Sequence, residues 1–305
     1  MKGTVFYKQT ELLLRILPLI YKEDVFALKG GTAINFFVRD LPRLSVDIDL
    51  TYLPVNDRNF ALNEIRSILL LISEGIKKRI PGTRVIPKRI HGAEFIKGLI
   101  INREGVTVKI EPNLVLRGSV YPPEIKMLSK KAQDYFELSL QSRILSPYDL
   151  YAGKICAALD RQHPRDLFDV HLLLKNEGLK PEIRKAFIVY LVSHPRPMVE
   201  ILSPQKKDIR DIFEKEFKGM IAEHITFEAL KTTRNKLVAI LREELTPDER
   251  KFIVSMKRGQ PVWDLLELEG IKDLPAVKWK LLNISKMDPS KHRKAIHKLR
   301  NYLCV

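Results

Sequence analysis

Two aspartates separated by one residue, Asp47 and Asp49, are the strongest candidates for chemistry in this chain of 305 residues. They lie in the run SVDIDL at 45–50, where polar and apolar residues alternate. This period of two is typical of a half-buried strand, so Ser45, Asp47 and Asp49 are predicted to share one face. Same-face neighbours lie about 7 Å apart along a strand, which lets two carboxylates reach one divalent cation or a pair. Mg²⁺ suits them, because few carboxylates bind it together with water and phosphate oxygens.

A pair of glycines precedes these aspartates. The apolar residues VFAL at 25–28 predict a buried strand that ends at Gly30 and Gly31, and 33–38 is predicted to be a helix. Glycines let the backbone approach a ligand closely, and N–H groups in the first helical turn favour an anion. Thr32 is expected to cap the helix or to bond a phosphate oxygen. Taken separately, a glycine pair before a helix is most often a plain turn, and an Asp-x-Asp on a strand is usually a solvated face.

Charged residues recur further along, on predicted helices. Ser146 is the predicted N-cap of a helix and Pro147 its first helical position. The body of this helix, 150–161, carries Lys154. Further charged residues on these helices are Arg161, Arg165, Asp166 and Asp169. Residues three or seven apart share a helical face, so Lys154 is predicted to share a face with Arg161, and Asp166 to share one with Asp169. A structural ion-pair network of Arg161, Arg165, Asp166 and Asp169 is one interpretation of this pattern, and a functional site is the other.

The pattern KGGT at 29–32 followed by RLSVDIDL at 43–50 resembles the opening motif of the DNA polymerase β-type nucleotidyltransferase superfamily. Within it, the chain resembles the AbiEii/AbiGii toxin family and its MenT relatives. Later motifs of that family, a lysine and an R-D-x-x-D segment, resemble Lys154 and the residues at 165–169. The resemblance extends over residues 25–175.

The resemblance implies a role for each of these residues. The triphosphate would be held by Gly30, Gly31 and Thr32, with Ser45 beside it, and one or two Mg²⁺ ions by Asp47 and Asp49. Lys154 would contact the nucleotide, and Asp166 would be the essential aspartate of its segment. Supporting roles are expected for Arg43, Arg161, Arg165 and Asp169.

Glu111 is the candidate for a third carboxylate. On the predicted strand 106–111, Val106, Val108 and Ile110 face one way, which leaves Glu111 on the other face. In the resembling superfamily, an acidic residue on a later strand often lies beside the Asp-x-Asp pair and accepts the proton of the attacking hydroxyl. The alternative is a plain surface glutamate.

These elements predict an α+β protein with two lobes and an active site between them. An α/β nucleotidyltransferase lobe with a mixed sheet is expected at 1–145, and an all-helical lobe at 146–305. A helix is expected at 6–22, bent or ended by Pro18, and another after Asn56 or Asp57. Strands are expected at 83–87, 95–102 and 106–111. Residues 176–305 are expected to be helical throughout.

The chain is strongly basic, with 53 Lys and Arg against 37 Asp and Glu and a formal net charge of +16. Such a charge favours a polyanionic partner, although a basic surface can serve solubility alone. Residues 271–305 carry nine Lys or Arg against Asp273 and Asp288, with Trp279 and Tyr302 among them. This segment suits an RNA backbone, or it is a solvated face.

The sequence favours a cytoplasmic protein. Two cysteines, Cys156 and Cys304, cannot form a disulfide framework, which fits a reducing compartment. Arg15 and Pro18 interrupt the apolar run at 12–20, which is therefore not a signal-peptide core. No stretch is long enough to span a bilayer, so no membrane partner is expected.

The resemblance implies a Mg²⁺-dependent nucleotidyltransferase toxin of a type IV toxin–antitoxin or phage abortive-infection system. Its substrate would be an NTP and its acceptor an RNA, with the 3′ end of tRNA as the acceptor in the MenT branch. An AbiEi-type winged-helix antitoxin would oppose it. Two alternatives remain open at this point: a phosphotransferase acting on a protein hydroxyl, and a non-catalytic nucleic-acid-binding module.

Overall fold

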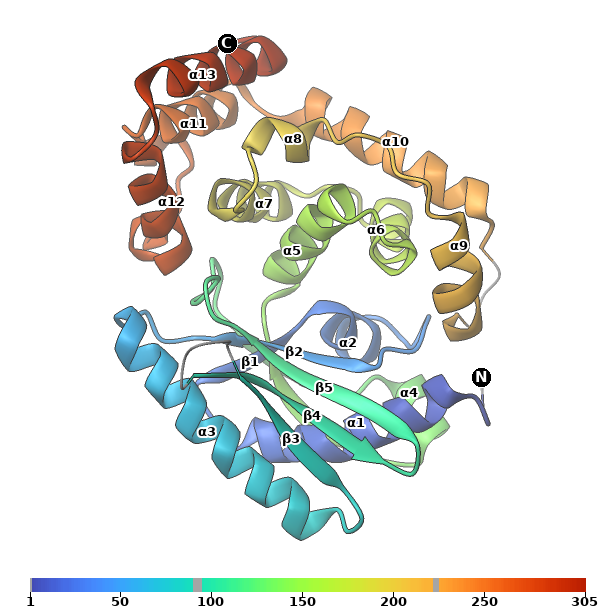
Figure 1. Cartoon of the computed structure of the whole chain (residues 1–305). Coiled ribbons are helices and arrows are strands. Elements are labelled where there is room, and N and C mark those ends of the chain that lie inside the picture. Colours follow the sequence, from blue (N-terminus) through green and yellow to red (C-terminus); the bar gives the residue numbers. More distant parts are fainter. Residues whose placement is uncertain (1, 90–94, 222–224) are drawn as a thin grey trace. The chain divides into compact units, whose positions relative to one another are not determined.

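The computed structural model describes residues 2–89, 95–221 and 225–305 (Figure 1). It divides into two compact units, each described here by itself. The first comprises Met1–Leu150 with Glu214–His224, and the second comprises Tyr151–Phe213 with Ile225–Val305. A mixed sheet together with many helices confirms the predicted α+β class. The division into lobes at 145/146 stays a prediction; the segment Glu214–His224, which belongs to the first unit, was not part of it.

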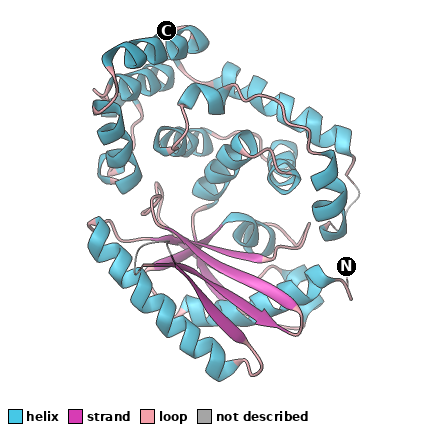
Figure 2. Cartoon of the chain, viewed as in Figure 1, coloured by secondary structure: helices cyan, strands magenta, loops and turns pink. Residues whose placement is uncertain are grey.

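A seven-stranded mixed sheet in the order β3-β4-β5-β2-β1-β7-β6 forms the centre of the first unit (Figure 2). β2 runs parallel to β5 and β1 runs parallel to β7, whereas the other neighbours are antiparallel. The strands are β1 (Phe26–Lys29), β2 (Asp47–Tyr52), β3 (Arg84–Arg89), β4 (Ile96–Arg103), β5 (Val106–Asn113), β6 (Glu124–Met127) and β7 (Gln141–Ile144).

Two long helices cover one face of this sheet, α1 (Val5–Tyr21) and α3 (Arg58–Arg79) (Figure 1). α1 continues past Pro18, which therefore does not end the helix. α3 begins where predicted, because Asp57 is its N-cap and accepts a hydrogen bond from the Phe60 amide at 2.9 Å. In β2 the burial pattern alternates at first, with Ile48 buried and Asp47 and Asp49 half-buried. The two aspartates therefore lie on the face opposite the apolar core residues.

The strands expected from the sequence are present, and two of the four-residue strands, β6 and β7, were not expected. β3, β4 and β5 confirm the strands expected between 83 and 111 to within two residues. β6 and β7 have only four residues each, EIKM and QSRI, and α4 (Lys130–Phe136) lies between them. EIKM alternates over only four residues and QSRI does not alternate, which is too little to predict a strand, so their pairing depends on tertiary contacts.

The second unit is helical among its described residues. Six helices begin with proline at their first position, where the missing N–H is not needed. The prediction that 176–305 is helical throughout is wrong at 204–209, which is irregular, and at 259–274, which holds only 3₁₀ turns. The helices are α5 (Pro147–Asp160, which begins in the first unit), α6 (Pro164–Asn176), α7 (Pro181–Ser193), α8 (Met198–Leu202), α9 (Arg210–Ile212), α10 (Phe227–Glu244), α11 (Pro247–Arg258), α12 (Pro275–Ser285) and α13 (Pro289–Leu303).

A buried carboxylate fixes the start of α5. Asp149 is 1% exposed and accepts hydrogen bonds from the amides of Val120 and Tyr121, both at 2.9 Å, and from the Ser146 hydroxyl at 2.8 Å. The Ser146 oxygen accepts in turn from the Asp149 amide at 3.1 Å, which confirms Ser146 as the N-cap. Asp149 therefore ties the loop after β5 to the first turn of α5.

We expect Asp149→Ala to lower the free energy of unfolding by about 2–3 kcal/mol, because buried N–H groups lose a charged acceptor. Asp134→Ala is a matched control: Asp134 is exposed and its ion pair with Lys130 lies on the surface. It should change stability by less than about 0.5 kcal/mol. Urea unfolding followed by circular dichroism measures both. Equal effects of the two substitutions would contradict the anchoring role of Asp149.

Candidate active site

The glycine pair packs directly against the side chains of the next strand and the loop before it. Gly30 opens α2 (Gly30–Ala33), which continues as a π-helical turn, Ile34–Val38. A Cβ atom on Gly30 would lie 2.5 Å from Asp49 Oδ2, and one on Gly31 would lie 2.5 Å from a guanidinium nitrogen of Arg43. Gly30 also has a φ of +70°, which residues with a side chain rarely adopt. Both positions therefore require glycine.

The hydroxyl of Thr32 bonds within the protein. It donates to the backbone carbonyl of Asp47 at 2.6 Å and lies 2.9 Å from Ser45 Oγ. Thr32 does not cap the helix as predicted, because the N-cap position is Lys29. Ser45 lies just before β2 rather than in it, and both hydroxyl residues are buried. Thr32 thus links the glycine turn to the first residue of the strand that carries both aspartates.

Arg43 is one of the largest fully buried side chains of the described chain, at 1% exposed. It donates to the Leu44 carbonyl at 2.8 Å and lies against Gly31. Its backbone forms an antiparallel bridge with Ile221, and the Leu44 amide donates to the Met220 carbonyl at 2.8 Å. Arg43, which was expected to support the site, therefore packs against the glycine turn.

Asp49 is half-buried, and its carboxylate forms no hydrogen bond or ion pair with any residue that the structure describes. Its backbone neighbours across the sheet are Lys29 on β1 and Glu111 on β5. Paired residues of neighbouring strands point to the same face, so Asp49 and Glu111 lie side by side, with Asp47 next along β2. Glu111 therefore lies beside the two aspartates, where a third carboxylate was expected from the sequence. One of its oxygens is already engaged, by the Lys88 ammonium at 2.6 Å.

The donor set suits a hard divalent cation. Asp47 and Asp49 offer carboxylate oxygens on one strand face, and Gly30 leaves open the space that a Cβ would fill beside Asp49 Oδ2. Within the described ranges, no three His, Cys, Asp or Glu side chains gather into a metal site. Two carboxylates are nevertheless sufficient for Mg²⁺, which takes its other ligands from water and substrate phosphates.

The second set of predicted residues forms a buried ion network in the helical unit. The Lys154 ammonium on α5 lies 2.9 Å from Asp166 Oδ1 and 3.0 Å from Asp169 Oδ2, both on α6. Arg161 reaches the other oxygen of Asp166 at 2.9 Å. Lys154 and both aspartates are buried, whereas Arg161 is largely exposed. Arg165 is the second residue of α6, and its amide donates to His163 Nδ1 at 3.1 Å.

The charges of this network act on Asp166. Burial raises the pKa of the Asp166 carboxyl, but the charges of Lys154 and Arg161 and the hydrogen bond from Lys154 outweigh it. The pKa of Asp166 is therefore held below its ordinary value. The structure contains an ion-pair network at this segment, formed by Arg161, Asp166 and Asp169 with Lys154 as an additional member.

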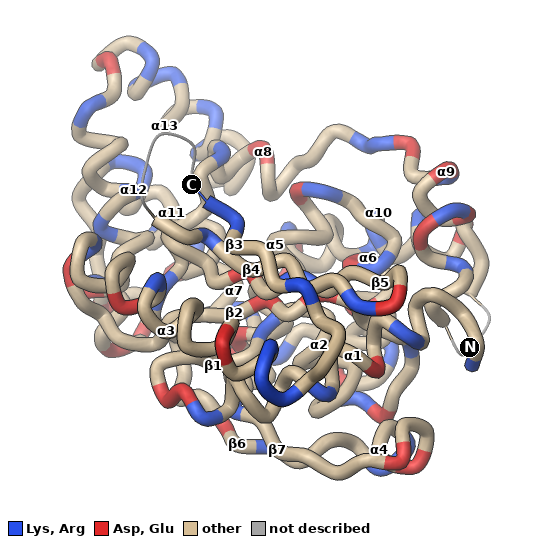
Figure 3. The backbone as a smooth tube through the Cα atoms, turned by 60° about the horizontal axis from the view of Figure 1, so that its bottom comes forward, with Lys and Arg blue, Asp and Glu red and all other residues tan. Residues whose placement is uncertain are grey.

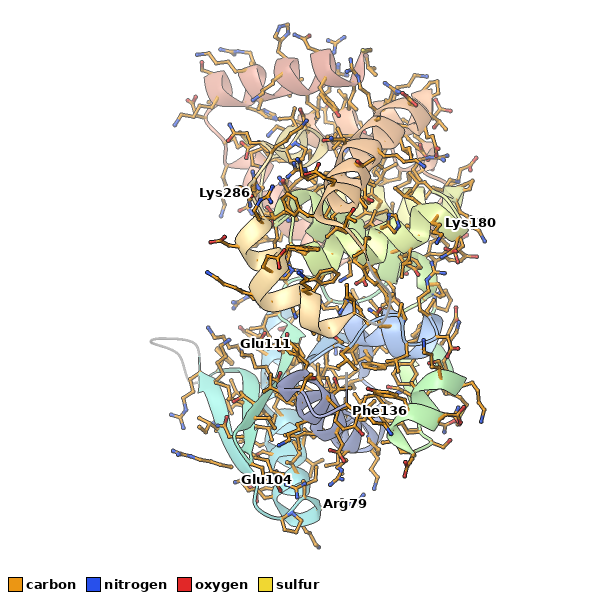
Figure 4. All side chains as sticks on the ribbon, turned by 90° about the vertical axis from the view of Figure 1, so that its right-hand side faces the viewer. Arg79, Glu104, Glu111, Phe136, Lys180 and Lys286 are labelled. Carbon is orange, nitrogen blue, oxygen red and sulfur yellow. The ribbon has the colours of Figure 1, made fainter. Side chains whose placement is uncertain are left out.

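The predicted residues thus fall into two groups, one in each unit. The glycine turn, the two β2 aspartates and Glu111 come together in the first unit, and the lysine network forms in the second. Lys88, which binds Glu111, was not singled out from the sequence, because only the strand register shows that the two residues meet. A hollow lined by Lys8, Glu11, Arg15, Arg103 and Glu104 is also present in the first unit. Glu104, which precedes β5, lies at the other end of that strand from Glu111 (Figure 4).

Comparisons with known proteins show what the chain is similar to. Residues 11–266 match a family model described as nucleotidyl transferase AbiEii toxin, type IV TA system. The fold is similar to that of MenT4, nucleotidyltransferase toxin Rv2826c from Mycobacterium tuberculosis H37Rv, with a TM-score of 0.59 and 15% identity. This alignment covers 98% of the chain and 92% of MenT4, and at that identity it shows the fold alone. No curated protein matches the chain.

We expect Gly30→Ala to destabilise the protein more than Gly105→Ala. Both glycines have a positive φ, +70° and +77°, so alanine costs about 1–2 kcal/mol at either position. A Cβ at Gly105 meets nothing within 4 Å, whereas at Gly30 it overlaps Asp49 and adds about 1–3 kcal/mol. Urea unfolding of both variants measures the difference. Equal losses would show that Asp49 moves away freely.

The lowered pKa of Asp166 predicts a pH dependence of stability. The group stabilises the fold above the unfolded pKa of about 3.9, and this contribution is lost as the pH falls through the lower folded pKa. We therefore expect wild type to be more stable than Asp166→Asn at neutral pH and to lose this advantage below about pH 4. Thermal unfolding from pH 7 to pH 3 tests it. An advantage that stays constant over this range would contradict the network.

Proposed function

The chain belongs to the AbiEii family of nucleotidyltransferase toxins, and on that premise we propose that it transfers nucleotides from an NTP to RNA with Asp47 and Asp49 as its Mg²⁺ ligands. Family membership makes it a nucleotidyltransferase of a type IV toxin–antitoxin system, with nucleotide substrates and an antitoxin that opposes it. The observation that carries the proposal is the unpartnered carboxylate of Asp49, packed against Gly30 and in register with Glu111.

The residues of the first unit have distinct parts in this proposal. Backbone N–H groups of Gly30 and Gly31 would hold the terminal phosphates at the start of the helical segment. Thr32 and Ser45 would act through their hydrogen bonds to each other and to β2, which fix Asp47. Mg²⁺ bound by the two aspartates would neutralise charge on the α-phosphate and on the leaving pyrophosphate.

Lys154 and Asp166 enter the proposal through the family motif. Lys154 would contribute a positive charge to nucleotide binding, and Asp166 and Asp169 would hold its ammonium in place. Arg161 supports Asp166 from the other side. The buried carboxylates fix the position of the Lys154 ammonium, unlike that of a flexible surface lysine, and its part in nucleotide binding rests on the family motif alone.

Surface charge supports RNA as the acceptor. The net charge is +16, and Lys and Arg recur along α12 and α13 (Figure 3). Among the described residues, the following exposed cations of this region form no ion pair: Lys286, Lys291, Arg293, Lys294 and Lys298. Trp279 on α12 is 53% exposed, as suits stacking on an unpaired base. Tyr302 does not contribute such a surface, because its hydroxyl donates to the Leu202 carbonyl at 2.8 Å.

The proposed acceptor is the 3′ end of tRNA, where added nucleotides would block aminoacylation. The toxin would act in the cytoplasm, where tRNA is charged, and would serve phage defence by stopping translation. Its antitoxin would be a winged-helix protein of the AbiEi type. No helix in the described ranges is long and apolar enough to cross a membrane.

The proposal predicts which phosphate of the NTP is transferred and to which acceptor. Purified protein, Mg²⁺ and total cellular RNA are incubated with each NTP in turn, labelled at the α- or the γ-phosphate, and then separated on a gel. We expect α-label in the tRNA band and none from γ-label. Asp49→Asn should lower this transfer by about 10²–10³-fold, because an interaction that stabilises transition-state charge is lost.

Two controls make the result specific. Asp134→Asn removes an exposed acid of the same unit and should leave transfer unchanged. Thermal unfolding confirms that Asp49→Asn remains folded. Transfer of γ-label to protein would instead indicate a phosphotransferase. RNA binding without any transfer would indicate a non-catalytic binding module.

A further inference from the structure

A row of residues crosses the sheet of the first unit and leads to Asp49. Lys88 on β3 pairs with Gly98 on β4, and Glu111 on β5 pairs with Asp49 on β2. The β4–β5 register places Gly98 between Lys88 and Glu111. Paired residues share a face. Lys88, Gly98, Glu111 and Asp49 therefore follow one another across the four strands on one face, and the glycine leaves a gap after the lysine.

The gap at Gly98 lets the lysine reach the glutamate. Lys88 and Glu111 are two strands apart, about 9.5 Å, a span that only two long side chains bridge. The Lys88 ammonium lies 2.6 Å from Glu111 Oε1. A Cβ on Gly98 would overlap the Ile110 carbonyl oxygen and would lie 3.5 Å from Glu111 Cγ. Position 98 therefore requires glycine where β4 pairs with β5, and no side chain stands between the lysine and the glutamate on this face.

The ion pair between Lys88 and Glu111 is not explained by its contribution to the stability of the fold. The side chains of Lys88 and Glu111 are 35% and 39% exposed, and ion pairs so open to water contribute little to folding. The effect of the Lys88–Glu111 ion pair on the site is electrostatic. It engages one oxygen of Glu111 and puts a positive charge beside the acid next to Asp49, where a second divalent cation would need a ligand.

We propose that Lys88 is a positioning residue that keeps Glu111 out of metal coordination, so that the site takes a single divalent cation at Asp47 and Asp49. The inference rests on the metal site assigned under the proposed function. Glu111 Oε2 then remains open to the acceptor hydroxyl. As the hydroxyl oxygen bonds to the α-phosphorus and the bond to pyrophosphate breaks, the hydroxyl proton passes to Glu111 and later to water.

The number of bound ions tests this directly, without an activity assay. Mn²⁺ accepts the same oxygen ligands as Mg²⁺, and the electron paramagnetic resonance signal of free Mn²⁺ reports binding during a titration. The full chain is titrated, and binding that persists in the D47N/D49N double variant is subtracted. We expect one specific ion in wild type and two in Lys88→Met, with at least about a tenfold gain in affinity for the second.

Two further variants separate the charge of Lys88 from its surroundings. Lys97→Met removes an exposed lysine next to Gly98 and should leave one ion. The double variant K88M/E111Q should return to one ion, because the second site needs the released Glu111 carboxylate. Two specific ions in wild type, or one in Lys88→Met, would overturn the inference. No specific ion in wild type would refute the metal assignment of Asp47 and Asp49 itself, and the inference would fail with it.

Discussion

The site of the first unit depends on a steric constraint, which is the missing Cβ atom at two successive positions. Any side chain at Gly30 would overlap the carboxylate of Asp49, and any at Gly31 would overlap the guanidinium of Arg43. Only glycines allow the first helical turn to lie against the residues of β2 and the loop before it. The same contact presents backbone N–H groups, which attract anions, beside a carboxylate that attracts cations. A nucleotide with its metal ion carries both charges.

Charged residues have different surroundings in the two units, and this difference bears on their roles. In the helical unit, the Lys154 ammonium lies between two buried aspartates, so the network resists change and fixes α5 against α6. In the first unit, the Asp49 carboxylate has no partner among the described residues. Only one oxygen of Glu111 is bound, by the Lys88 ammonium. Groups left partly unsatisfied are the ones that can bind a ligand, whereas a satisfied network mainly sets position.

Local patterns predicted much of this structure, because strong periodicity and caps act over few residues. The strand before Gly30, the alternation around Asp47, and the helix caps at Asp57 and Ser146 are all present. The errors arose where tertiary contacts decide. Thr32, expected to cap its helix or to bond a phosphate oxygen, bonds the Asp47 carbonyl; the four-residue strands β6 and β7 are too short to be predicted; and the Lys88 contact depends on strand register.

The central claim is that Asp47 and Asp49 together bind the metal ion of nucleotidyl transfer. Its most direct test is the anomalous diffraction of crystals grown with Mn²⁺ and a non-hydrolysable NTP analogue. The account predicts a Mn²⁺ peak at coordination distance, about 2.1 Å, from carboxylate oxygens of both aspartates, with triphosphate oxygens completing its shell. A peak that touches neither aspartate, with the triphosphate bound elsewhere in the chain, would contradict it.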